Sequence, residues 1–300
     1  MFLAICFVWG LSFVLMKYGR VVFGALTVGG VRLFGGAVFL GLLWLVMRRG
    51  NQKHLGAFGR MVRKDRWAVL VPAFVGMAWP FSMQPYLIGK YDNSAFFGMM
   101  VCLTPLITIL VSVPMLGVWP KVRELIGVIG GLIGVWMLFG DAVERSISWL
   151  DFIWAVSVPL SYAVSNVFVK RRLGSVPSVL LAMSALGLGA LVVLPIGLGG
   201  EVIEDASWGG ISFALGCVVF LGVIGTGLSM WWFYVLIGAR GPLFAGMVTY
   251  VVCSFAVFWG WVDGEAVTWR QMVALGVILG MTALVQWPSQ KPRLRESVIA

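Results

Sequence analysis

Long apolar stretches alternate with short polar gaps along the whole chain. Each stretch lasts roughly 17 to 25 residues, which is the length that an α-helix needs to cross the hydrocarbon core of a bilayer and about twice what a barrel strand needs. A spanning helix also satisfies its own backbone hydrogen bonds, as lipid requires. The pattern therefore predicts an all-α membrane protein with ten transmembrane helices, over residues 1–17, 24–47, 67–89, 94–118, 125–140, 150–169, 178–198, 211–237, 241–262 and 271–288.

The composition supports this prediction. Hydrophobic residues make up 60% of the chain and charged residues 11%, with a mean hydropathy of +0.98. A soluble protein has about 25% charged residues, so this exterior must face lipid. The net charge of +10 could suggest nucleic-acid binding, but the charges are confined to the gaps between apolar stretches. We expect a lipid bilayer and a small-molecule substrate as partners, and no nucleic acid.

The basic residues predict the orientation of the chain. Numbering the gaps alternately, one set holds sixteen Lys and Arg residues and the other holds five, while the acids lean the opposite way. Cytoplasmic loops of membrane proteins carry the excess of Lys and Arg. Both termini are therefore predicted to be cytoplasmic in a bacterial inner membrane. The predicted cytoplasmic gaps are 48–66, 119–124, 170–177, 238–240 and the tail from 289.

The two halves of the chain resemble each other. Leu87-Ile88-Gly89 corresponds to Leu236-Ile237-Gly238 at an offset of 149, and Ser12 and Lys17 correspond to Ser165 and Lys170 at an offset of 153. Five spans in each half place the second half in the opposite orientation, which is a common architecture of secondary transporters. We therefore expect two inverted five-helix repeats, over residues 1–140 and 141–300, the second ending in a short basic cytoplasmic tail.

Several short motifs resemble EamA-type carriers of the drug/metabolite transporter superfamily. Trp9-Gly10-Leu11-Ser12-Phe13-Val14 with Lys17 is similar to the first span of that family, and Val31-Arg32-Leu33-Phe34 to the second. The other matching motifs are Leu103-Thr104-Pro105-Leu106, Ser161-Tyr162-Ala163 with Asn166-Val167 and Lys170-Arg171, and Gly264-Glu265 with Gly276 and Gly280. The resemblance covers the whole chain. It implies a ten-helix bundle of two repeats that exports metabolites such as amino acids.

Polar and aromatic residues inside the spans are candidates for a substrate cavity. Small-molecule sites combine aromatic walls with a few hydrogen-bonding groups. In membrane helices, however, Ser also bonds to its own backbone, and Trp and Tyr also lie at the water interface. The candidate substrate-binding residues are Trp9, Ser12, Gln84, Tyr86, Ser161, Tyr162, Ser165, Asn166, Trp231, Tyr234 and Tyr250.

Three cations and three prolines are further candidates. Arg32 lies inside the second span, where it either attracts an anionic substrate group or snorkels to the headgroups. Lys17 and Lys170 end equivalent spans on opposite sides, so they are candidate gate charges, with snorkelling as the alternative. Proline removes a helix hydrogen bond, which makes Pro80, Pro105 and Pro159 candidate hinges.

The sequence offers few residues for catalysis, metal binding or proton coupling. The single histidine, His54, lies in a loop, and we expect no catalytic residues, metal or cofactor. The four cysteines lie in apolar stretches, so they are expected to be small buried residues without a disulfide framework. No Asp or Glu lies deep in a span, which favours a facilitator or exchanger over coupling through a buried acid.

The predicted function is therefore a secondary transporter, an exporter of small metabolites that works by alternating access around a central cavity, as a monomer or weak homodimer. A multidrug efflux carrier is the alternative within the same class. A membrane enzyme or a channel is the alternative from other classes, and counterflow in reconstituted vesicles separates them.

Accessibility labelling tests the topology. Single cysteines placed within 141–149 or 199–210 are expected to react with an impermeant thiol reagent from outside the cell, because these segments are predicted outer loops. Cysteines placed within 48–66 or in the tail are expected to react once the membrane is opened. The reverse pattern, or chain ends on opposite sides, would contradict the inverted repeat.

Overall fold

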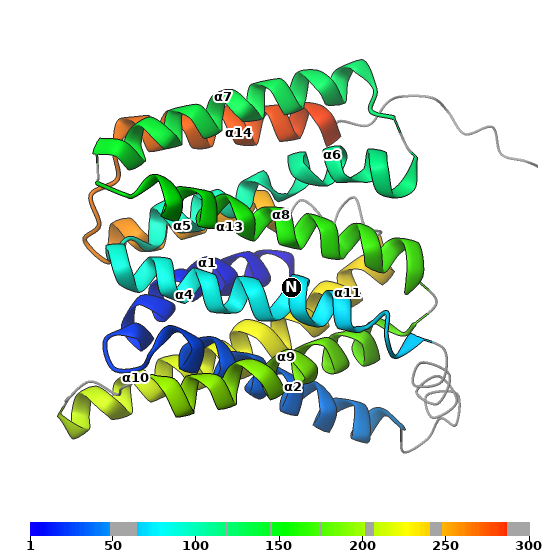
Figure 1. The fold of residues 1–300 in the computed structure, drawn as a ribbon, viewed down its shortest axis with the longest axis vertical. Coiled ribbons are helices and arrows are strands. Elements are labelled where there is room, and N and C mark those ends of the chain that lie inside the picture. The colour runs from blue at the N-terminus through cyan, green and yellow to red at the C-terminus, as the bar shows by residue number, and fades with distance from the viewer. Residues whose placement is uncertain are drawn as a thin grey trace, which may run out of the picture.

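The computed structural model describes residues 1–48, 65–117, 119–144, 146–174, 176–201, 207–240 and 248–286. Within these ranges all regular structure is helical, and the helices run along a common direction as a layered bundle (Figure 1). In chain order the elements are α1 (Phe2–Arg20), α2 (Ala25–Arg48), η2 (Pro72–Ala78), α4 (Trp79–Tyr91), α5 (Ser94–Met100), η3 (Val101–Leu103), α6 (Thr104–Leu116), α7 (Val122–Glu144), α8 (Trp149–Arg172), α9 (Ser178–Gly200), α10 (Trp208–Phe220), η4 (Leu221–Leu228), α11 (Ser229–Arg240), α13 (Val248–Val262) and α14 (Trp269–Gln286).

Seven helical segments in the described part of the chain are long and apolar enough to cross a membrane. They correspond to the first, second and fourth to eighth predicted spans. The remaining three predicted spans contain the shorter helices η2 with α4, α13, and α14. The fifth span is longer than predicted, because α7 covers Val122–Glu144, while the sequence suggested residues 125–140. A protein of membrane-spanning helices is thus confirmed, and the count of ten stays a prediction.

Three helices change type at glycine- or proline-rich segments. The π-helices η2 and η4 precede α4 and α11, and the short 3-10 helix η3 precedes α6. Pro80 and Pro105 lie in the first turns of α4 and α6, directly after η2 and η3. Pro159 instead lies inside the continuous helix α8. The structure therefore places two of the three candidate hinge prolines where the helical winding changes.

Carboxylates gather at one end of the bundle, which we call the acidic end. Asp92, Asp141, Glu144, Asp151, Glu201, Asp263 and Glu265 lie at helix termini or connections there. The Glu265 carboxylate accepts hydrogen bonds of 2.8 Å from the backbone N–H groups of Ser94 and Ala95, at the start of α5. Glu201 accepts two bonds of 2.8 Å from Leu26 and Thr27 in α2. Helix N-termini leave such N–H groups without partners, so these acids join distant segments through the backbone.

Helices α7 and α14 pack closely against each other at one side of the bundle (Figure 1). A β-carbon at Gly127, Gly130 or Gly134 of α7 would overlap side chains of α14, so the missing side chains let the two helices approach. At Gly276 and Gly280 of α14 a β-carbon would meet no atom within 4 Å. The close contact therefore depends on the glycines of α7.

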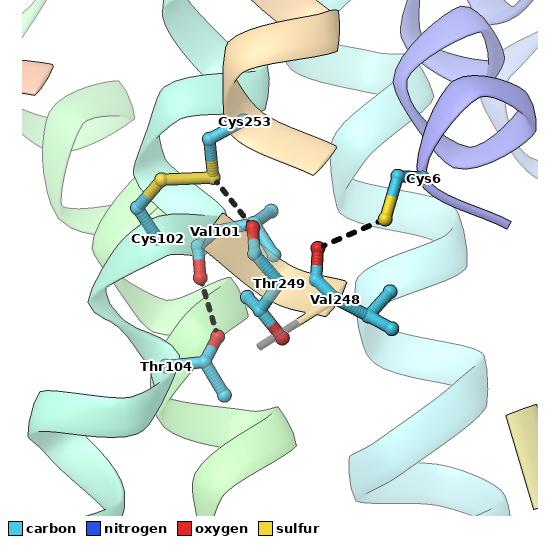
Figure 2. The surroundings of a disulfide bond; sticks show 7 residues. All are labelled: Cys6, Val101, Cys102, Thr104, Val248, Thr249 and Cys253. Atoms are coloured by element: carbon cyan, nitrogen blue, oxygen red, sulfur yellow. Dashed lines mark hydrogen bonds between the residues drawn. A yellow bond between two sulfur atoms is a disulfide. The ribbon is translucent and has the colours of Figure 1, made fainter. Parts of the chain in front are cut away.

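The expectation for the cysteines was half wrong. Cys6 and Cys217 are buried and free, as expected. Cys102 of η3 and Cys253 of α13 form a disulfide, with their Cα atoms 6.2 Å apart (Figure 2). The two positions are 151 residues apart, close to the repeat offset of 149 found in the sequence. The near-equivalence of Cys102 and Cys253 becomes visible only when the two cysteines are compared across the repeat.

Replacing Gly134 tests the α7–α14 contact. Gly134→Val should lower the free energy of unfolding by about 1–3 kcal/mol, because the new side chain would overlap Ile278 and lie against the Ala274 carbonyl oxygen of α14. Thermal unfolding in lipid nanodiscs measures the effect. Gly140→Val in the same helix is the matched control, because a β-carbon there meets no atom within 4 Å. Equal melting temperatures for the two variants would contradict the packing.

Candidate substrate cavity

A cavity of about 210 Å³ lies inside the bundle. Its walls come from α1, α2, η2, α4, η3, α6, α8, η4, α11 and α13, so both halves of the chain contribute. The lining residues are Trp9, Ser12, Phe13, Met16, Arg32, Gly76, Met77, Phe81, Gln84, Val101, Thr104, Tyr162, Ser165, Asn166, Gly225, Thr226, Met230, Phe233, Thr249 and Val252. The wall thus combines aromatic and methionine side chains with hydroxyl and amide groups.

The structure brings many of the predicted residues together here. The six predicted substrate-binding residues that line the cavity are Trp9, Ser12, Gln84, Tyr162, Ser165 and Asn166, and Arg32 joins them. Tyr162, Ser165 and Asn166 are spaced i, i+3 and i+4 along α8, so they share one helix face. Their role in binding substrate stays a prediction.

Other predicted residues lie elsewhere. The Tyr86 side chain is 40% exposed, and its ring centroid lies 5.7 Å from Lys90 Nζ. Ser161 is buried and donates a hydrogen bond to the Val158 carbonyl oxygen. Trp231 packs against a hydrophobic cluster that includes Leu186. The side chains of Tyr234 and Tyr250 lie outside the described residues.

Two glycine–serine contacts shape the cavity. A β-carbon at Gly76 of η2 would overlap Ser165 Oγ, and one at Gly225 of η4 would come within 3.2 Å of Ser12 Oγ. Trp9 Nε1 also donates a 2.9 Å hydrogen bond to the Gly225 carbonyl oxygen. At these two glycines, the π-helices η2 and η4 approach α8 and α1 closely because no side chain lies between them. Gly76, Gly225 and Thr226 were not among the predicted site residues, because their role depends on neighbouring helices that the local sequence does not reveal.

The acidic end is closed by charged groups around Lys17. Lys17 Nζ lies 2.6 Å from an Asp263 oxygen, 3.3 Å from Asp92 and 3.5 Å from Glu265. Tyr18 donates a hydrogen bond to Asp263 as well. The Lys17 side chain is 15% exposed and that of Asp263 6%. These contacts connect α1 to the α4–α5 and α13–α14 connections, so the first half is fastened to the second.

The opposite end of the cavity is more open. Asn166 lines the cavity and is itself exposed, whereas Ser12, Met16 and Gln84 are buried. Lys170, one turn beyond Asn166, is exposed at the end of α8. The candidate gate charges therefore differ: Lys17 is held by three carboxylates, and Lys170 lies on the surface.

A bundle of apolar helices around a partly polar cavity, closed at one end by charge pairs, has the architecture of a membrane transporter. The EamA-like transporter family matches residues 1–140 and again residues 149–287. The chain therefore belongs to this family, within the drug/metabolite transporter superfamily, and is a membrane transporter.

Similarity to individual proteins agrees with this assignment. The chain is 24% identical over 289 residues to the "Uncharacterized transporter YoaV" of Bacillus subtilis (strain 168), covering 93% of this chain and 90% of that one. A solved crystal structure, 20% identical, superposes with a TM-score of 0.63 and covers 95% of both chains. That likeness supports the helical fold.

Removing the Lys17 charge tests the closed end. Lys17→Met leaves three carboxylates facing one another without a cation, so we expect a loss of about 2 kcal/mol in unfolding free energy. Hydrogen exchange in residues 94–97 should also quicken, because Glu265 is freed from the cluster. Lys170→Met, a matched change of an exposed lysine, should alter neither measurement. Unchanged exchange in Lys17→Met would show that the cluster does not hold this end.

Proposed function

We propose that the protein is a secondary transporter that exports small metabolites such as amino acids by alternating access around the described cavity. The single observation that carries the proposal is the cavity itself, which is walled by both halves of the chain and closed at the acidic end by the Lys17 cluster. Asn166 is exposed at the end of the cavity opposite the acidic end. This exposure supports entry of substrate from that end, which the charge pattern predicts to be cytoplasmic.

We further propose that the bundle has ten spanning helices arranged as two inverted repeats. The π-helices η2 and η4 begin 149 residues apart, the same offset as the sequence matches. The pairs Gly76–Ser165 and Gly225–Ser12 exchange places under this repeat. Helix contacts follow the same repeat. The contact of α1 with α13 corresponds to the contact of α8 with α6, and the equivalent helices of the two halves pack on each other in the pairs α2–α9 and α7–α14. The two family matches support the repeat too.

The proposed inverted repeat provides a structural basis for alternating access. Two related bundles of opposite orientation can exchange conformations and expose one site to each side in turn. In the proposed cycle, the Lys17 cluster is the outer gate, which separates when substrate leaves. The described acids lie at helix ends and not beside the cavity, which supports facilitated diffusion or exchange in place of proton coupling through a buried carboxylate. The Phe and Met walls also suit an amphipathic drug, so efflux of such compounds is the second candidate.

Relief of metabolite toxicity tests the proposal. Cells that express the protein should tolerate at least one compound of a toxic metabolite panel, and Trp9→Ala and Asn166→Ala should reduce this relief severalfold without lowering the amount of protein in the membrane. Trp9 anchors η4 through Gly225, and Asn166 offers an amide at the open side. Tyr86→Ala is the control, because Tyr86 lies outside the cavity.

Counterflow in reconstituted vesicles separates a carrier from the alternatives. Preloading with the unlabelled compound should accelerate uptake of the labelled compound. A channel would show no such acceleration, and an enzyme would return an altered molecule. Full activity of both cavity variants would show that substrate binds elsewhere.

A further inference from the structure

Arg32 is a cation that lies buried beside the cavity. Arg32 is the eighth residue of α2, which places it about 10 Å from the start of the helix at 1.5 Å per residue. It is 7% exposed and lines the cavity. A side chain that snorkels to the headgroups would turn outward, and this one turns into the bundle.

Among the described residues, the groups that contact Arg32 are all neutral. Its Nε donates a 2.9 Å hydrogen bond to Thr226 Oγ1, and its Nη1 lies 3.4 Å from Met16 Sδ. Its Cζ lies 4.4 Å from the centroid of the Phe81 ring. A hydroxyl, a thioether and an aromatic face are neutral groups. In the described part of the chain, no Asp or Glu lines the cavity or forms an ion pair with Arg32.

A buried charge of this kind destabilises the folded protein. Burial of an ion without an oppositely charged partner is strongly unfavourable, and ionisable groups inside membranes mark substrate pathways. Arginine cannot relieve this cost by losing its proton. Thr226 and Phe81 instead hold the guanidinium in place beside the cavity, so the missing negative charge can come with the molecule that enters.

We propose that Arg32 is the docking point for the carboxylate of the transported molecule, and that the substrates are small monocarboxylates with an apolar body. The inference rests on the proposed transport function and names its substrate class. Guanidinium binds a carboxylate through two parallel N–H···O bonds. A phosphate dianion would bring two negative charges, and among the lining residues of the described structure Arg32 is the one that carries a full charge.

The remaining walls describe the rest of the substrate. Phe13, Phe81 and Phe233 form aromatic surface within reach of an apolar body, and Gln84 and Asn166 offer neutral amide groups for a hydroxyl or ammonium. The volume of about 210 Å³ is below the roughly 300–1,000 Å³ typical of sites for drug-sized ligands. A metabolite with a carboxylate therefore fits better than a large lipophilic cation.

Paired ligands that differ in charge test the proposal on the unmodified protein. The probes are 3-phenylpropanoate and hexanoate, their neutral amides 3-phenylpropanamide and hexanamide, and phenylethylamine as a cation of similar body. Binding to the full chain in nanodiscs is measured by thermal shift and by titration calorimetry. Each acid is expected to bind at least about tenfold more tightly than its amide, because a charged hydrogen-bonded contact is lost with the amide. Equal affinities, tighter binding of the amine, or no binding by either acid would overturn the proposal.

Substitutions at Arg32 then locate the site. Arg32→Gln should abolish the preference for acid over amide, while Arg32→Lys should keep a reduced preference, because lysine retains the charge but loses the bidentate geometry. Trp231→Phe, outside the cavity, should keep the full preference. If Arg32→Gln does not fold, Arg32→Lys and the ligand pairs on the unmodified chain decide the matter. A full acid preference in a folded Arg32→Gln protein would overturn the proposal.

Counterflow with the same probes distinguishes this inference from the transport proposal. Acid binding that depends on Arg32 without counterflow would support the anion site and contradict transport. Counterflow of a compound without any acid preference would support transport and overturn the anion site.

Discussion

Backbone N–H groups at the start of a helix have no partner within that helix, and lipid supplies none. At the starts of α5 and α2, carboxylates from distant segments supply partners. Glu265 binds the first amides of α5, and Glu201 binds those of α2. The same bonds that satisfy local backbone groups therefore fasten the two halves of the chain together. The bonds from α5 also fix Glu265, which is one of the acids that surround Lys17 at this end of the cavity.

The helices could be predicted from the sequence because lipid demands both length and low polarity. The cavity could be predicted where polarity and repeat equivalence agreed, as at Trp9 with Tyr162 and Ser12 with Ser165. Helix rotation was the weak point. Gln84 and Tyr86 are two residues apart, about 200° around a helix, so they cannot both face the cavity, and Tyr86 lies outside it.

The features that sequence patterns missed depend on contacts between helices. Gly76 and Gly225 matter because Ser165 and Ser12 lie against them, and a single helix gives no sign of that approach. The environment of Arg32 also depends on tertiary structure, since Thr226 comes from the other half of the chain. Whether Arg32 faced lipid or the interior could not be predicted from its position along α2.

The disulfide between Cys102 and Cys253 limits how the bundle can move. It ties η3 to α13 with the Cα atoms of the two cysteines 6.2 Å apart (Figure 2). The neighbouring residues Val101 and Val252 form part of the cavity wall. A rearrangement that opens the acidic end must leave this separation almost unchanged. In the proposed alternating-access cycle, the disulfide would keep η3 and α13 together while the surrounding helices move, so that access to water would change on the Arg32 side and the Asn166 side of a wall that stays in place.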